Sequence, residues 1–258
     1  MRETSWLTRR PVAHRGLHDA ARGIIENTPS AVRAAIAEGF AIEVDVQRAR
    51  DGEAMVFHDG TLDRLTWAQG PLAHLSQGEL AAIPFRQGPD RMMTLPQLLA
   101  LVAGQVPLVV EIKSAFDGDV RLATRTAQLL ADYCGPAALM SFDPAQLVQA
   151  RAVAPEVIRG IVAERRYDDA DGLHLSRAKR FCLANLLHWP WSRFDFMAYR
   201  VSDLPAAAPA FGQLCRLPLL TWTVRSAEAL ARGRRHADQV IFEGIDPTPE
   251  NEAPLQTS

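Results

Sequence analysis

Eight short runs rich in Val, Ile and Phe recur along the chain, and this repetition constrains its fold more than any other feature. The runs occupy Val12–His14, Ile42–Asp45, Leu108–Lys113, Ala138–Phe142, Ile158–Val162, Asp195–Tyr199, Leu219–Thr223 and Gln239–Glu243. Stretches with helical periodicity separate them, at Pro29–Glu38, Leu95–Val102, Val120–Tyr133, Ala145–Val153, Leu173–Leu187 and Ala227–Arg232. Eight strands with intervening helices close most naturally into a barrel. We therefore predict an α/β protein built as a single (β/α)8 TIM barrel.

Length and composition agree with one barrel domain. Such a barrel takes about 250 residues, and this chain has 258, of which 48% are hydrophobic. We expect the domain to cover residues 1–247. Residues 60–93 are rich in Gly and Pro, and they predict a short insertion between strands two and three of the kind that often caps a site. Residues 248–258 have no periodicity and predict a disordered tail.

Charge and hydropathy argue against several classes of protein. Lys and Arg number 28 against 30 Asp and Glu, so the net charge of −2 gives no general attraction to nucleic acid. The N-terminal sequence lacks the apolar run of a secretory signal. No apolar stretch reaches the roughly 18 residues that a membrane span needs. We expect a cytoplasmic protein without a stable membrane anchor, whose oligomeric state the sequence does not indicate.

The second and third predicted strands carry charged residues that strand parity turns toward the barrel axis. Their apolar neighbours take the helix-facing parity, so Glu43 and Asp45 point inward, as do Glu111 and Lys113. Three carboxylates at one barrel mouth repel one another unless a cation is bound. Oxygen ligands without cysteine select Mg²⁺ or Ca²⁺. An internal salt-bridge network of the same four residues is the alternative.

Asp51-Gly52 lies between two extended runs and predicts a two-residue hairpin turn. In that register Asp45 faces His58, and directly opposed side chains lie on the same face of a hairpin. We therefore expect His58 at the barrel mouth beside the acids.

His14 and Arg15 end the first strand, although a buried histidine beside an exposed arginine would explain this pair equally well. Thr28 is a plausible N-cap for the helix that follows. Capping does not explain Glu26 or Asn27, which lie where the start of that helix faces the barrel mouth.

Together these pieces resemble the glycerophosphodiester phosphodiesterase family, whose motifs occur here in order and at the family's spacing. The motifs are His14-Arg15-Gly16, Glu26-Asn27-Thr28, Glu43 with Asp45, His58-Asp59, and Glu111 with Lys113. The likeness continues through Thr61–Thr66, Leu95–Leu99, Ser141-Phe142 and Thr221–Thr223, so it covers nearly the whole chain. The chain departs from the family after the eighth strand, where it has Phe242–Pro247 in place of a Thr-Asp pair.

The resemblance implies hydrolysis of a small-molecule glycerophosphodiester to glycerol 3-phosphate and an alcohol, aided by a divalent cation, Mg²⁺ or Ca²⁺. It implies cation ligands at Glu43, Asp45 and Glu111, acid–base catalysis by His14 and His58, and positive charge on the phosphate from Arg15 and Lys113. Substrate contacts are expected from Arg15, Glu26, Asn27 and Trp222, and the alternative for Trp222 is an ordinary core residue.

Two other functions stay open. A lysophospholipase D or related phosphodiesterase on the same fold would need an apolar groove. The insertion offers Leu72, Leu75, Leu80, Ile83 and Phe85, which suit either such a groove or a small core of the insertion itself. A degenerate barrel that binds phosphate without catalysis is the more distant alternative.

Overall fold

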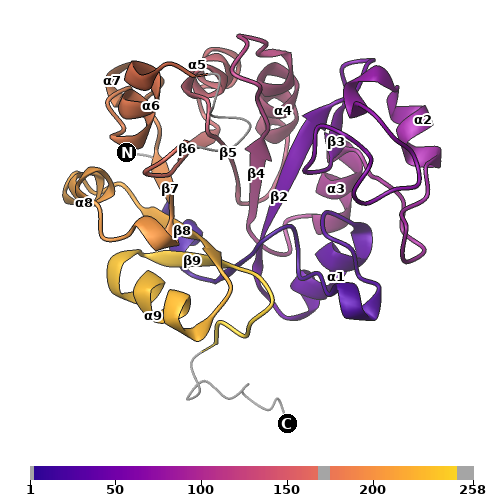
Figure 1. Ribbon diagram of the computed structural model, residues 1–258, viewed down its shortest axis with the longest axis horizontal. Helices are drawn as coiled ribbons and strands as arrows, with labels where there is room; N and C mark the ends of the chain where they lie inside the picture. The colour runs from indigo at the N-terminus through magenta and orange to yellow at the C-terminus, as the bar shows by residue number, and fades with distance from the viewer. Residues whose placement is uncertain (1–2, 168–174, 249–258) are drawn as a thin grey trace.

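The computed structural model describes residues 3–167 and 175–248, and its centre is a closed barrel of eight parallel strands (Figure 1). The barrel strands are β1 (Val12–Ala13), β2 (Ala41–Arg48), β4 (Leu108–Ile112), β5 (Ala137–Ser141), β6 (Ile158–Ala163), β7 (Phe196–Arg200), β8 (Leu219–Val224) and β9 (Gln239–Phe242). The barrel closes because β1 pairs with both β2 and β9, through Val12 opposite Ala41 and Ile241. The predicted TIM barrel is confirmed.

Helices surround the barrel (Figure 1). They are α1 (Pro29–Ala37), α2 (Gln77–Ala82), α3 (Leu95–Val102), α4 (Arg121–Ala131), α5 (Pro144–Val153), α6 (Arg177–Ala184), α7 (Trp189–Ser192), α8 (Ala207–Leu214) and α9 (Ala227–His236). The start of the predicted helix 173–187 and the predicted tail from residue 249 lie outside the described residues. In the described parts of the chain, no helix combines the length and apolar character needed to cross a membrane.

Strand parity sorts the barrel residues as the sequence predicts. On β4 the inward Val109 belongs to the interior cluster, whereas Val110 packs with the helices. Leu7, from a short 3-10 helix at Ser5–Thr8, joins the interior cluster. On β6, Gly160 makes room for the ring of Phe196, because a Cβ at that position would lie 2.2 Å from a ring carbon. The barrel is thus filled by side chains, and only its mouth is free to bind a ligand.

At the carboxyl end of each strand, the residue two positions after the last interior residue also points inward. Together these residues form a ring of polar and aromatic side chains at the barrel mouth. They are His14, Glu43, Glu111, Phe142, Glu164, Arg200, Trp222 and Glu243. The strands β9, β1, β2 and β4 are consecutive neighbours and supply one acidic and histidine-bearing half. The strands β5 to β8 supply the other half, which carries the aromatic rings and one ion pair.

The predicted hairpin is present, but its predicted register is wrong by one residue. The short strand β3 (Ala54–Val56) runs antiparallel to β2 with Val46 opposite Val56, and Asp45 accepts a 3.0 Å bond from the N–H of Phe57 rather than facing His58. The loop has three residues, ending in Gly52 at φ 91°, and it is closed by a bond from Ala49 N–H to the carbonyl of Glu53. Gly at positive φ suits two- and three-residue loops alike, so the dipeptide could not fix the register.

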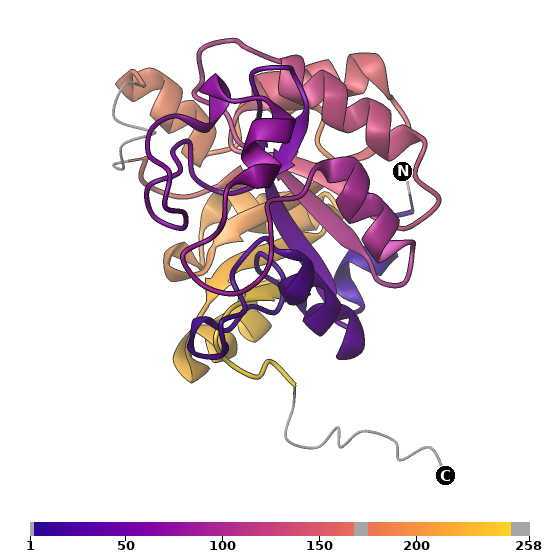
Figure 2. The ribbon, with the colours of Figure 1, turned by 90° about the vertical axis from the view of Figure 1, so that its right-hand side faces the viewer.

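The insertion, residues 60–93, folds beside β3 and α3 on one flank of the barrel (Figures 1 and 2). It contains a 3-10 turn at Leu72–His74 and α2. Leu72, Leu80 and Phe85 are buried with Met55 and Phe57 of the hairpin. These apolar side chains therefore form the small core of the insertion itself rather than an open groove.

Candidate active site

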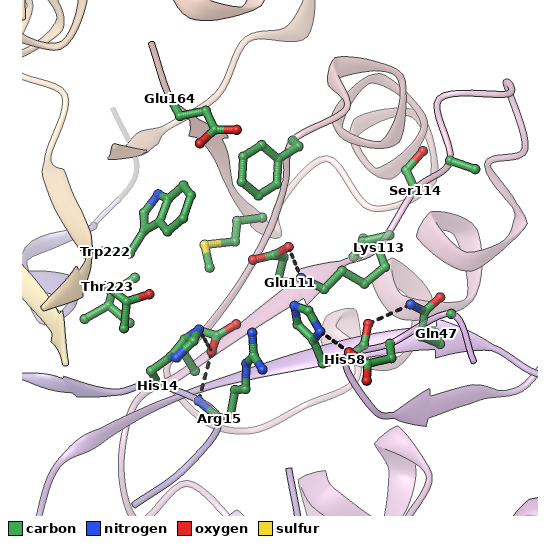
Figure 3. Close-up of a pocket in the computed structure, with 18 of the residues that line it drawn as sticks. His14, Arg15, Gln47, His58, Glu111, Lys113, Ser114, Glu164, Trp222 and Thr223 are labelled. Carbon is green, nitrogen blue, oxygen red and sulfur yellow. Dashed lines mark hydrogen bonds and ion pairs between the residues drawn. The ribbon is translucent and has the colours of Figure 1, made fainter. Parts of the chain in front are cut away.

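The barrel mouth holds a cavity of about 550 Å³, and seven of the predicted site residues line it (Figure 3). The seven are His14, Arg15, Glu43, His58, Glu111, Lys113 and Trp222. Asp45 lies beneath this wall and is fully buried. Glu26 and Asn27 do not line the cavity; they reach it through Arg15 and Asp45.

Glu43, Asp45 and Glu111 form a tight acidic cluster. The three residues can each offer a carboxylate oxygen such that all three atoms lie within 4.8 Å of one another, and all three residues are buried. Lys113 Nζ lies 2.8 Å from Asp45 Oδ1 and 2.6 Å from Glu111 Oε1. Burial opposes ionisation of Asp45, but the positive charges of Lys113 and its other cationic neighbours outweigh it and hold the pKa of Asp45 below its usual value.

Glu43 has one carboxylate oxygen that the ion pairs of this cluster do not use. Its Oε2 accepts the backbone N–H of Arg15 at 3.0 Å, whereas its buried Oε1 has no hydrogen-bond partner. Burial, followed by the charges of Asp45 and Glu111, raises the pKa of Glu43 well above its usual value. Lys113 completes an ion-pair network for the other two acids only. Buried polar atoms are usually paired, and a hard cation bound by oxygen atoms would give the Glu43 Oε1 atom a partner.

The segment before α1 holds Asp45 in place. Thr28 caps the helix by accepting the N–H of Ala31, as predicted. Asn27, just before it, adopts φ 58°. The Asn27 amide donates to Asp45 Oδ2 at 2.9 Å, and its carbonyl oxygen accepts the Asp45 backbone N–H at 3.1 Å. These two hydrogen bonds fix the orientation of the Asp45 carboxylate, which the apolar packing of β2 alone would not fix.

Arg15 bridges two acids at the edge of the same cluster. Its Nη1 donates to Glu26 Oε1 at 2.7 Å, and its Nε lies 3.3 Å from Asp45 Oδ2. Glu26 is held in turn by Arg64, which donates to both of its carboxylate oxygens. Arg15 is therefore held rigidly against the cavity wall.

His14 is positioned by a residue that sequence reasoning did not identify. Its Nδ1 lies 2.8 Å from Glu243 Oε2, and Arg225 binds the same oxygen at 2.8 Å. Burial lowers the pKa of His14, and the Glu243 carboxylate works against that effect. With Nδ1 engaged, Nε2 is the nitrogen that faces the acids, 3.9 Å from Glu43. Glu243 belongs to the segment that departs from the family motif, and inward parity on β9 was the signal that would have found it.

His58 lies at the mouth although the predicted register is wrong. It follows β3, where the chain has left the strand, and its carbonyl accepts Gln47 Nε2 at 2.8 Å. Its Nδ1 lies 2.6 Å from Asp59 Oδ1, and Arg64 binds both oxygens of that carboxylate. Each histidine thus has a carboxylate at Nδ1 and an arginine behind it, an arrangement that fixes the ring orientation.

The opposite half of the mouth is aromatic. Trp222 and Phe142 meet edge to face with ring centroids 5.4 Å apart, and Phe142 and Tyr167 do so at 6.2 Å. Trp222 donates its indole N–H to the Ala198 carbonyl at 3.1 Å. The buried Glu164 carboxylate lines the same half of the cavity and pairs with Arg200 at 2.8 Å.

Comparison with known proteins places this site in a family. The sequence profile described as "Glycerophosphoryl diester phosphodiesterase family" matches residues 14–236. The chain belongs to this family. A curated relative, the glycerophosphodiester phosphodiesterase of Caldanaerobacter subterraneus subsp. tengcongensis, is 35% identical over 111 residues. That alignment spans 40% of this chain and 44% of the relative.

Solved structures of other phosphodiesterases share the fold. A phosphodiesterase from Oleispira antarctica, in complex with the product sn-glycerol-3-phosphate, superposes with a TM-score of 0.73 at 20% identity, covering 90% of this chain and 91% of that one. The glycerophosphodiester phosphodiesterase of Thermotoga maritima gives 0.68 at 19% identity, with 91% and 94% covered. The shared fold thus extends through the barrel that carries the mouth residues.

Proposed function

We propose that this chain hydrolyses glycerophosphodiesters to glycerol 3-phosphate and an alcohol with the help of Mg²⁺ or Ca²⁺. Family membership and the activity named for the Caldanaerobacter relative support the reaction class. The product bound to the Oleispira phosphodiesterase supports glycerol 3-phosphate as one product. The observation that carries the proposal is that two oriented histidines and a buried acidic cluster line or underlie one cavity.

The cation site would consist of Glu43, Asp45 and Glu111. Their oxygen-only donor set and the unsatisfied Oε1 of Glu43 fit a hard divalent ion. Such an ion, when bound, supplies positive charge that stabilises the phosphoryl oxygens as negative charge develops. Lys113, whose pKa is raised by its two acidic partners in spite of burial, remains a cation and adds to that charge.

The two histidines would carry the proton transfers. Each has Nδ1 bound to a carboxylate, so Nε2 is the atom available to the substrate. One histidine takes a proton from the nucleophile, and the other gives a proton to the leaving alkoxide. Arg15, held by Glu26 and Asp45, presents its guanidinium at the cavity wall, where a phosphate oxygen would meet a planar donor. The nucleophile is either water or the neighbouring glycerol hydroxyl, which would form a cyclic phosphate first.

The test is a side-by-side assay of glycerophosphocholine, glycerophosphoethanolamine and lysophosphatidylcholine in EDTA, Mg²⁺ and Ca²⁺. We expect chelation to abolish turnover and one of the two ions to restore it. Full turnover after exhaustive dialysis against EDTA would refute the cation assignment. Phosphorus NMR of the reaction would detect a cyclic phosphate if the glycerol hydroxyl attacks.

We also propose that the enzyme works in the cytoplasm on soluble substrate. All three cysteines, Cys134, Cys182 and Cys215, are free thiols, as expected in a reducing compartment. Fractionation of cells that express the chain would test this location.

A further inference from the structure

The two halves of the cavity suit two different chemical groups. The acidic half carries the histidines and charged side chains that a phosphate requires. The aromatic half, which we define as Phe142, Tyr167, Trp222 and Glu164, offers ring faces and one carboxylate. A phosphodiester has two alcohol arms, so a substrate whose phosphate lies over the acids can direct one arm against these rings.

From this division we propose that the aromatic half is a binding site for a cationic trimethylammonium head group, such as choline, on the substrate's leaving alcohol. This inference rests on the proposed phosphodiesterase function. The same head group occurs in glycerophosphocholine and in lysophosphatidylcholine, and the experiment below separates these two sources.

The geometry of the rings supports a cation site. Phe142 lies at 83° to Trp222 and at 88° to Tyr167, so its ring is nearly perpendicular to both of the other rings. The faces of aromatic rings attract cations within about 6 Å of the ring centre. The indole N–H of Trp222 is bonded to the Ala198 carbonyl, which leaves the ring to contribute its faces and edges.

The charges point the same way. Glu164 is buried, and it comes from the inward position next after Val162 on β6, so its carboxylate lies at the mouth. An ion pair with Arg200, whose side chain is half-exposed, holds this carboxylate in place at 2.8 Å. A trimethylammonium group needs no hydrogen-bond acceptor and matches this site of ring faces and one held carboxylate. A primary ammonium could donate to the Glu164 carboxylate, but against the aromatic rings it would lose the rest of its hydration.

Phe116 also lines the cavity but does not belong to this site. The ammonium of Lys179 already lies over its ring, 5.0 Å from the centroid. The glycerol arm needs hydrogen-bond partners for its hydroxyls, and polar side chains such as Gln47 and Ser114 line the cavity on the acidic side.

The test compares glycerophosphocholine with an uncharged isostere in which a carbon replaces the choline nitrogen. We expect kcat/KM for glycerophosphocholine to exceed that for the isostere by about tenfold, within the range of cation–π contacts in desolvated sites. Phe142→Leu should remove most of this ratio, Phe142→Tyr should keep it, and Glu164→Gln should reduce it. Phe211→Leu is the matched surface control, since Phe211 is 63% exposed on α8. Equal kcat/KM for the charged and uncharged members of both this pair and the lipid pair below, in the unmodified enzyme, would overturn the proposal.

Lysophosphatidylcholine and its own uncharged isostere form the second arm. A tenfold ratio with this pair alone would identify the lipid as the source of the head group, and a ratio with the glycerol pair would identify the soluble diester. An unchanged ratio in a folded Phe142→Leu variant would overturn the proposal for both.

A binding measurement separates this inference from the function on which it rests. Tryptophan fluorescence of the cation-loaded protein is titrated with tetramethylammonium and, separately, with the uncharged 3,3-dimethylbutanol, and Trp222→Phe identifies the responding residue. If tetramethylammonium binds more tightly than 3,3-dimethylbutanol but no diester is hydrolysed, the proposed phosphodiesterase function is refuted and the proposed cation site is supported. Hydrolysis of all diesters with no preference for tetramethylammonium would refute the cation site alone.

Discussion

Replacing Glu43 by glutamine should stabilise the cation-free protein while disabling the enzyme. The side chain is buried, one carboxylate oxygen is unsatisfied, and the other two acids lie close to it. At 4.8 Å and an effective dielectric constant of about 20, each like-charge pair costs about 3.5 kcal/mol. Attraction to Lys113 and Arg15 offsets part of this repulsion, and proton uptake by Glu43 limits it. We expect Glu43→Gln to gain about 2 kcal/mol, or roughly 4–8 °C in Tm.

The pH dependence of this gain follows from the direction of the pKa shift. The folded-state pKa of Glu43 is raised above its ordinary value of 4.5. The destabilisation is therefore absent below pH 4.5 and grows as the pH rises toward the folded-state pKa. Glu43→Gln should gain little at pH 4 and most at pH 7.5 or above.

The assay is thermal unfolding in EDTA and then with increasing Mg²⁺ or Ca²⁺. Added cation should raise the Tm of the unmodified protein, because a cation that binds the native state stabilises that state. The rise should be much smaller for Glu43→Gln, which has lost one of the proposed ligands. Glu38→Gln, an exposed change at the end of α1, is the matched control. A Glu43→Gln protein that is less stable than the unmodified chain in EDTA would show that the acids form a structural salt-bridge network instead.

Three further predictions concern the histidines. His14→Ala and His58→Ala should each lower kcat by about 10² to 10⁴-fold with circular dichroism unchanged, and wild-type turnover in either variant would make that histidine structural. Glu243→Gln should lower kcat by roughly 10- to 100-fold with little change in KM, because it removes a charged hydrogen bond that orients His14; an equal loss in Glu243→Asp would indicate disruption of the loop instead. Burial lowers the pKa of His188 from 6.5 to about 4. The neutral ring therefore stabilises the folded protein fully at pH 7, and the free energy of unfolding should fall by up to about 3 kcal/mol as the pH drops from about 6.5 to 4. Urea denaturation of His188→Gln, in which this slope should flatten, checks the assignment.

The barrel and its acidic cluster followed from periodicity and parity. Apolar residues at alternate positions on β2 and β4 turned Glu43, Asp45 and Glu111 inward, and the structure brings them together. The same rule applied to β5, β6 and β9 would have found Phe142, Glu164 and Glu243. Ser141-Phe142 is noted only as part of the family likeness, and Glu164 and Glu243 carry no local motif, so their place in the site is evident only when the strands lie side by side.

The hairpin shows where local sequence could not decide. Asp51-Gly52 marks a turn in both a two-residue and a three-residue loop, and the choice between them shifts the register by one residue. The structure selects the longer loop, with Gly52 at φ 91°. His58 reaches the mouth because the chain leaves β3 after Val56 and is held by Gln47, a contact between segments that the dipeptide could not specify.

The bond between His14 and Glu243 joins residues 229 positions apart, and this separation has a consequence for biosynthesis. A ribosome adds about 5–20 residues per second, so the first histidine waits roughly 10 to 45 s for its partner carboxylate. Until β9 has been made, β1 also lacks one of its two neighbouring strands. A nascent chain therefore carries His14 long before it can hold that ring in working geometry, and a partly synthesised molecule should be inert toward phosphodiesters in the cell.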